Sequence, residues 1–402
     1  MKEEAGALPR EAPKSTTVSL VMLALGWVMI YADRLSISPL MDVIKSEFHL
    51  TYTSTSLVLD VYFAAYIGFT IPATMAASRW GYRRVMATFL LLAAVSLALA
   101  GVAGYVFSLL VFFIGIHGVG AGAFYPTAYK ISTDTVPREK RGFTSAVINS
   151  GMGFGTMLGL IIAGPVLYFF SSWQIVFLIL AVPTALVALL LFRIVPDANV
   201  SSYAQNSKFE ASKYAEVLRN GNFLLISAMM FCSLYGYWVI LSWGPTLIQK
   251  SLHLSVFWSG GATAVFAAVA IPCSIIISNH SDRAGRKKIA LLILPLAGLT
   301  IFLVAYTSSL TEFLFAMIAY GVIGKLSLDP IAIAWVADVT PAEQIGPSLA
   351  LLNVVAMSSS IFASIVTGAI GDYTGALSDG FYLGGFVVLL GAVFVALVKS
   401  RS

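Results

Sequence analysis

The sequence predicts an all-α integral membrane protein with twelve transmembrane helices arranged as two pseudo-symmetric six-helix bundles. Hydrophobic residues make up 58% of the 402 residues and charged residues only 11%, a composition outside the range of soluble globular domains. Twelve apolar segments each approach the roughly 20 residues that a helix needs to cross a bilayer. An internal repeat relates the two halves of the chain.

The twelve segments divide the chain into two halves of six. They fall near residues 17–40, 57–77, 85–105, 108–131, 143–168, 172–194, 222–250, 256–278, 288–307, 310–337, 347–371 and 380–399. The polar stretch 195–221 is expected to be a cytoplasmic linker between an N-terminal bundle, 17–194, and a C-terminal bundle, 222–399. Residues 1–16 and 400–402 are expected to be cytoplasmic tails, because the first apolar run is too long for a signal-peptide core.

Basic residues gather on one side of the predicted membrane. Of the 24 Lys and Arg residues, Arg34 and Lys325 fall inside spans, Lys45 and Lys250 lie on the opposite side, and the remaining 20 lie in the tails and the connections after even-numbered spans. By the positive-inside rule both termini are cytoplasmic. Compact loops favour a cell inner (plasma) membrane. The net charge of +5 then reflects contact with lipid head groups, and no nucleic-acid partner is expected.

Charged residues inside the spans are the first candidates for a functional site. Asp33 and Arg34 lie in the first span, where charge is costly and usually functional. Arginine stays protonated, so Arg34 must find an anion in a protein-lined cavity. Tyr31 and Ser38 share its helix face, whereas Asp33 points about 100° away. Asp60, in the second span, is a second acid that can reach the cavity or lie near its outer end.

The two halves repeat at a constant offset of 204 residues. The matching pairs include Arg79 and Arg283, Gly81 and Gly285, Pro126 and Pro330, Asp134 and Asp338, and Asn149 and Asn353. A repeat of this kind implies two similar bundles related by an axis along the membrane normal, with a binding site between them near the midplane. Within the fifth span, Gly151, Gly155 and Gly159 form a small-xxx-small face that predicts close helix packing.

The connections 78–84 (SRWGYRR) and 281–288 (SDRAGRKK) are similar to the G-x-x-x-D-R-x-G-R-R signature of the major facilitator superfamily, and the resemblance covers essentially the full chain. It implies a transporter whose cytoplasmic helix ends are cross-linked while the cavity faces outward. The gate candidates are Arg79, Arg83, Asp282, Arg283, Asp134 and Asp338. Because Ser78 replaces the first aspartate, this gate should be weakened.

Within that superfamily, YADRLSIS (31–38) resembles the first helix of the anion:cation symporter branch, which transports organic acids. The resemblance implies that Arg34 binds a substrate carboxylate, that Asp33 takes part in proton coupling, and that Tyr66 belongs to the site. The branch also has an arginine and a glutamate in its fourth helix, where this chain has Ile114 and Ala121. A role for that glutamate is therefore not carried over.

The repeat places Lys325 opposite Ala121 and Asp329 opposite Tyr125. Lys325 and Asp329 stand four residues apart on one helix face. Two interpretations stay open: they neutralise each other, or Lys325 anchors substrate and Asp329 is its switchable partner. His117 is either a proton relay, since imidazole titrates near neutrality, or a packing residue.

Aromatic and amide side chains complete the candidate binding site, and each either contacts ligand or fills the packing between bundles. They are Tyr31, Tyr66, Tyr125, Tyr235, Trp238, Asn149 and Asn353. Two cations in one cavity would suit a dicarboxylate or a hydroxylated acid, and one cation among aromatics would suit a monocarboxylate or aromatic acid. The sequence leaves this choice open.

We therefore expect proton-coupled symport of a small organic anion by a monomer, with Asp33 as the leading proton carrier and Asp60, Asp329 and His117 as further candidates. A drug:proton antiporter is an alternative suggested by Gly164-Pro165, although Leu160, Val166 and Leu167 depart from that signature. A membrane sensor that does not transport is another. No motif of an enzyme, a cofactor site or a metal site is found, so uphill transport would draw on an ion gradient.

Overall fold

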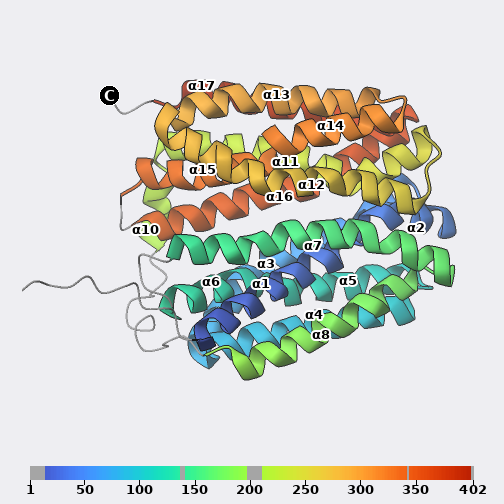
Figure 1. Ribbon diagram of the computed structural model, residues 1–402, viewed down its shortest axis with the longest axis horizontal. Coiled ribbons are helices and arrows are strands. Elements are labelled where there is room, and N and C mark those ends of the chain that lie inside the picture. Colours follow the sequence, from blue (N-terminus) through green and yellow to red (C-terminus); the bar gives the residue numbers. More distant parts are fainter. Residues whose placement is uncertain (1–13, 136–140, 197–210, 342–343, 400–402) are drawn as a thin grey trace, which may run out of the picture.

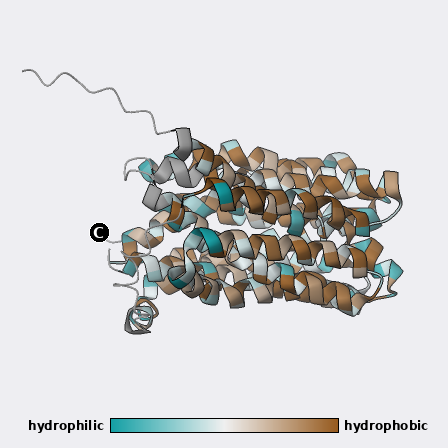
Figure 2. Ribbon diagram, turned by 90° about the horizontal axis from the view of Figure 1, so that it is seen from below, coloured by the Kyte–Doolittle hydropathy of each residue, from teal (hydrophilic) through white to brown (hydrophobic). Residues whose placement is uncertain are grey.

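The computed structural model describes residues 14–135, 141–196, 211–341 and 344–399, and these are almost entirely helical (Figure 1). Twelve of the described helical segments are long and apolar enough to cross a membrane, which confirms the predicted all-α architecture. Figure 2 shows hydrophobic residues along the length of the helices and hydrophilic residues mainly near their ends. Helices suit this setting because they satisfy their own backbone hydrogen bonds in lipid.

The N-terminal bundle contains six spans, of which the first and fourth are interrupted. Its elements are α1 (Lys14–Leu35), η1 (Ser38–Leu40), α2 (Met41–Glu47), α3 (Tyr52–Trp80), α4 (Tyr82–Ala103), α5 (Phe107–Gly122), α6 (Phe124–Thr135), α7 (Arg141–Phe170) and α8 (Gln174–Ile194). The first span runs through α1, η1 and α2, and the fourth through α5 and α6.

The C-terminal bundle also contains six spans. Its elements are α11 (Gly221–Ser251), α12 (Val256–Ala284), α13 (Arg286–Tyr306), α14 (Leu310–Ile323), α15 (Lys325–Val339), α16 (Ile345–Thr374) and α17 (Leu377–Leu397), and the short helix α10 (Ala211–Val217) precedes them. The tenth span is interrupted at Gly324, between α14 and α15.

The internal repeat is visible in the backbone. Helix α12 begins and ends 204 residues after α3, and α16 does the same after α7. Gly81 and Gly285, at matching positions, both have a φ of 97°, while His49 and His253 have φ values of 53° and 52°. A φ of 97° favours glycine, so the tight turn after α3 and α12 explains the glycine in both copies.

Helix α7 packs closely against α1 through its glycines, as predicted. A Cβ added at Gly151, Gly155 or Gly159 would lie 2.4, 2.4 or 2.6 Å from a carbonyl oxygen of α1. No real side chain tolerates such a distance, so these positions set the separation of the two helices. The same contact fixes the orientation of α1, which carries Asp33 and Arg34.

The two bundles lie side by side, blue to green below and yellow to red above in Figure 1. They meet where α7 packs on α12 and α3 packs on α16. We call the side that holds residues 14 and 399 the terminal side, and the side that holds α2 the distal side.

Candidate functional site

Arg34 lies near the middle of the first span, Thr17–Glu47. Helix α1 ends one residue later, and the chain continues as the 3-10 turn η1, which contains Pro39. Proline has no N–H to continue an α-helical ladder, which explains the interruption. Only 1% of the Arg34 surface is exposed.

Four aromatic rings surround the Arg34 guanidinium. Its central carbon lies 4.1 Å from the ring centre of Tyr31, 4.9 Å from Trp238, 5.4 Å from Phe63 and 5.6 Å from Tyr62. Such distances allow cation–π attraction. Because Trp238 belongs to α11 and the other rings to α1 and α3, Arg34 lies between the two bundles.

The Arg34 side chain has unused hydrogen-bond donors. Its Nε and Nη2 atoms are buried without a partner, and within the described ranges no carboxylate forms an ion pair with it. These two nitrogens form one edge of the guanidinium, the edge that can grip a carboxylate with two parallel hydrogen bonds. A buried charge without a partner is costly, so this edge is suited to an anion.

Asp33 faces away from Arg34, into the N-terminal bundle. Its carboxylate is fully buried and lies 3.0 and 3.1 Å from the hydroxyl of Thr184 on α8. The same hydroxyl also lies 2.9 Å from the carbonyl of Leu180. Among the described residues Asp33 has no basic partner.

Lys325 forms an ion pair with Asp329, which is one of the two arrangements that the sequence allowed. The Lys325 Nζ lies 2.5 Å from Asp329 Oδ2 and 5.0 Å from the ring centre of Tyr237. Lys325 is buried at the start of α15, and Asp329 Oδ1 is buried without a partner. In this conformation the lysine is therefore occupied by its own helix.

The remaining candidate proton carriers, Asp60 and His117, are both buried. Asp60 accepts a hydrogen bond from Ser56, 2.7 Å away, and its Oδ1 has no partner. His117 Nδ1 lies 3.0 Å from the carbonyl oxygen of Ala93. Because a carbonyl only accepts, Nδ1 carries the hydrogen and Nε2, which has no partner, is left free.

The other predicted binding residues are only partly brought together with Arg34. Tyr66 stacks on Tyr62 with ring centres 6.2 Å apart, and Tyr125 packs on Trp27 at 5.9 Å. Tyr235 is buried with a hydroxyl that has no partner. Asn353 is half-buried on α16, and the side chain of Asn149 lies outside the described residues.

Comparison with known proteins assigns the family. Residues 23–327 and 260–402 match the family model described as Major Facilitator Superfamily. The chain belongs to this superfamily. The predicted resemblance, including the likeness to its organic-acid transporters, is thereby confirmed, because several relatives carry such names.

Similar members of the superfamily include the hexuronate transporter of Bacillus subtilis (strain 168), which is 24% identical over 95% of this chain and 93% of the relative. The putative tartrate transporter of Agrobacterium vitis is 21% identical over 96% and 90%. The probable sulfoacetate transporter SauU of Cupriavidus necator is 26% identical over 59% of this chain and 58% of its own length.

A solved structure confirms the superfamily fold. A bacterial homologue of the human lysosomal transporter Spinster, described as inward-facing and occupied, superimposes with a TM-score of 0.80. The alignment covers 98% of this chain and 97% of that one, at 16% identity. Two similar six-helix bundles are thus the architecture of this superfamily member.

On the terminal side, the described ion pairs of the predicted gate residues lie within one bundle. Asp282 and Asp338 both pair with Arg286, at 3.6 and 2.6 Å, within the C-terminal bundle. Arg83 Nη1 donates to the Val195 carbonyl at 3.3 Å within the N-terminal bundle. Arg79 and Arg283 are exposed, and the side chain of Asp134 lies outside the described residues. Arg286 was not among the predicted gate residues, although it stands in the 281–288 motif.

On the distal side, polar contacts join the two bundles. Asp372, on α16, accepts hydrogen bonds from the backbone N–H groups of Tyr52 and Thr53, at 2.7 and 2.8 Å, and from the Thr53 hydroxyl at 2.6 Å. These N–H groups begin α3 and have no partner within that helix. The Lys250 ammonium lies 2.8 Å from the Asp42 carboxylate.

Further distal contacts involve η1. The Ser38 hydroxyl donates to the Leu241 carbonyl, and Gln249 Nε2 donates to the Pro39 carbonyl at 2.9 Å. We call this set of contacts the distal latch. The sequence did not predict the distal latch, because the two partners of each contact belong to different bundles and no short motif marks them.

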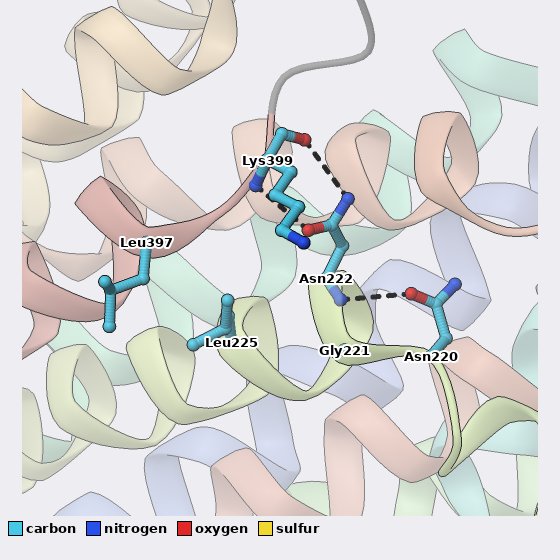
Figure 3. Close-up of a pocket in the computed structure, with 6 residues that line it drawn as sticks. All are labelled: Asn220, Gly221, Asn222, Leu225, Leu397 and Lys399. Carbon is cyan, nitrogen blue, oxygen red and sulfur yellow. Dashed lines mark hydrogen bonds between the residues drawn. The ribbon is translucent and has the colours of Figure 1, made fainter.

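The hollow in Figure 3 lies on the terminal side, since Lys399 is among the residues that line it. It is lined by the start of α11 and the end of α17, where Asn222 exchanges hydrogen bonds of 3.1 and 3.0 Å with the backbone of Lys399. Asn220 caps α11 by accepting from the N–H groups of Asn222 and Phe223. These polar groups satisfy one another, so they fasten α17 to α11 within one bundle.

Proposed function

We propose that this protein moves a small organic anion across a cell inner (plasma) membrane by symport with protons. The observation that carries the proposal is the free Nε and Nη2 edge of Arg34, buried between the bundles. An organic acid supplies the anion that this edge lacks. The names of the relatives support the substrate class, since they include hexuronate and tartrate transporters.

Alternating access accounts for where the contacts lie. The positive-inside rule places the terminal side in the cytoplasm, so the distal latch closes the outer side and the conformation faces inward. Among the described residues no ion pair joins Arg79 or Arg283 to the other bundle, which agrees with this state. Opening outward would break the latch and bring the gate residues of the two bundles together.

Asp33 and Thr184 support the coupling of transport to protons. A hydroxyl has one hydrogen, so Thr184 either donates to Asp33 or donates to Leu180 and accepts from a protonated Asp33. The observed distances of 2.9 to 3.1 Å suit both arrangements. The pair can therefore hold Asp33 with or without its proton. Asp60, Asp329 and His117 are the further candidate carriers.

The test is a thermal-shift screen of the purified full-length protein against monocarboxylates, dicarboxylates, sugar acids and lipophilic cations. Arg34→Ala is compared with wild type, and Arg193→Ala, which removes an exposed arginine from the end of α8, is the matched control. An acid should stabilise wild type and the control, because a ligand that binds only the native state stabilises it, and should fail to stabilise Arg34→Ala. Stabilisation by lipophilic cations in all three proteins, with no response to acids, would instead favour a drug:proton antiporter.

A further inference from the structure

We infer that the site at Arg34 selects a monocarboxylate with a flat ring as its body, and discriminates against dicarboxylates and polyhydroxylated acids. The inference rests on the proposed function and narrows its substrate class. Three observations carry it: Arg34 is the one buried cation without an ion-pair partner among the described residues, two aromatic rings separate it from Lys325, and aromatic side chains surround its guanidinium.

Among the described residues buried between the bundles, one positive charge is available to bind a ligand carboxylate. Arg34 has a buried edge with two nitrogens that lack partners. Lys325, the other buried Lys or Arg among the described residues, is held by Asp329 at 2.5 Å, so this pair carries no net charge. One carboxylate neutralises Arg34, and a second carboxylate on the same ligand would be buried without a partner, which is costly.

Two aromatic rings separate the cations. Lys325 lies 5.0 Å from the ring centre of Tyr237, Tyr237 lies 5.3 Å from the ring of Trp238, and Trp238 lies 4.9 Å from the Arg34 carbon. Tyr237 and Trp238 are neighbours on α11, so this helix places two aromatic rings between Arg34 and Lys325. A short diacid held at Arg34 does not meet the lysine in this arrangement.

The Arg34 guanidinium is surrounded by rings. Phe63 packs on Trp238 at 4.5 Å between ring centres, and Tyr31 and Tyr62 complete the set around the guanidinium. Aromatic side chains favour flat apolar groups stacked or edge-on against them. Of the residues that contact Arg34, Tyr62 and Trp238 each have one buried polar atom without a partner, a hydroxyl and an indole N–H. These two atoms are fewer than the several hydroxyls of a sugar acid, so most of those hydroxyls would be buried without a partner.

The experiment compares matched acids on the full-length wild-type protein by isothermal titration in detergent. Benzoate and terephthalate share a ring and differ by one carboxylate. Benzoate and gluconate each carry one carboxylate, but benzoate has a flat aromatic ring where gluconate has a polyhydroxylated chain. Benzoate should bind about fivefold or more tightly than either, since a buried polar group without a partner lowers affinity by at least about that factor.

Substitutions of the protein's aromatic residues test how much the ring of the ligand contributes to binding. Phe63→Leu and Trp238→Leu should each weaken benzoate more than acetate, which has no ring. Trp258→Leu removes an exposed tryptophan from α12 and should leave the ratio of benzoate to acetate affinity at the wild-type value. The wild-type comparison needs no variant, so it decides the question even if a ring substitution impairs folding.

The outcomes separate the two proposals. Equal or tighter binding of terephthalate or gluconate, lost in Arg34→Ala, would overturn the inferred ring-bearing monocarboxylate while the proposed anion transport stands. An unchanged benzoate-to-acetate ratio in both ring variants would overturn the role of the rings. Absence of binding by any acid, including the panel used to test the proposed function, would contradict both proposals.

Discussion

The distal latch should stabilise the inward-facing conformation, and Asp372→Ala tests this. The substitution removes the acceptor of three hydrogen bonds of 2.6 to 2.8 Å that cross from α16 to the first turn of α3. Asp372 is an exposed residue, so water replaces part of what is lost. Removing an acidic cap from a helix start costs about 1–2 kcal/mol, which shifts a two-state equilibrium by about 5- to 30-fold.

The assay is a distance measurement between spin labels on the distal side of the two bundles. Tyr105 and Tyr306 are suitable positions because both are exposed, one in each bundle. The labels are attached to cysteines at these positions, after Cys232 and Cys273 are replaced by serine. Asp372→Ala should increase the population with a long distal distance.

Asp379→Ala is the matched control for this experiment. Asp379 lies in the first turn of α17 on the distal side, and no described hydrogen bond or ion pair of its side chain crosses to the other bundle. The control should leave the distance distribution at the wild-type value. An unchanged distribution in Asp372→Ala, or the same change in both variants, would refute the latch.

Three further predictions follow from the site and the packing. Asp33→Asn should abolish accumulation driven by a pH gradient and retain counterflow exchange in liposomes, because the amide still bonds Thr184 and carries no titratable proton; retained accumulation would contradict the assignment. Arg34→Lys should weaken acid binding by about tenfold or more in titration calorimetry, because an ammonium lacks the two-nitrogen edge, and unchanged affinity would show that charge alone suffices. Gly155→Ala should lower thermal stability by about 1–3 kcal/mol, since its Cβ would lie 2.4 Å from the Val28 carbonyl oxygen. Gly68→Ala, which meets nothing within 4 Å, is its control, and equal melting temperatures would contradict the packing.

The fold could be predicted from the sequence in detail. A helix that crosses lipid must be long and apolar, so the spans could be predicted from the apolar segments of the sequence. The offset of 204 residues between the halves reappears in the bounds of α3 and α12. The separation of Asp33 from Arg34 also followed from helix geometry alone. The interruption at Ser36–Ile37 was not predicted, although Pro39 was its signal.

The surroundings of Arg34 were predictable only in part. Tyr31 and Trp238 were named, whereas Tyr62 and Phe63 were missed because an apolar span does not reveal which residues face inward. Spacing offered one signal, since Tyr62 stands four residues before Tyr66 on the same helix face. The contact of Asp372 with α3 joins positions about 320 residues apart, and local patterns carry no information on such pairs.

Gradient-driven uptake is the measurement that tests the central claim most directly. Purified wild-type protein and Arg34→Ala are reconstituted in liposomes, and uptake is followed for the labelled acid that most stabilises wild type. With the outside made acidic, wild type should accumulate the acid above its external concentration, a protonophore should abolish the accumulation, and Arg34→Ala should show none. Accumulation that is independent of the proton gradient, or that persists in Arg34→Ala, would contradict proton symport of an anion bound by Arg34.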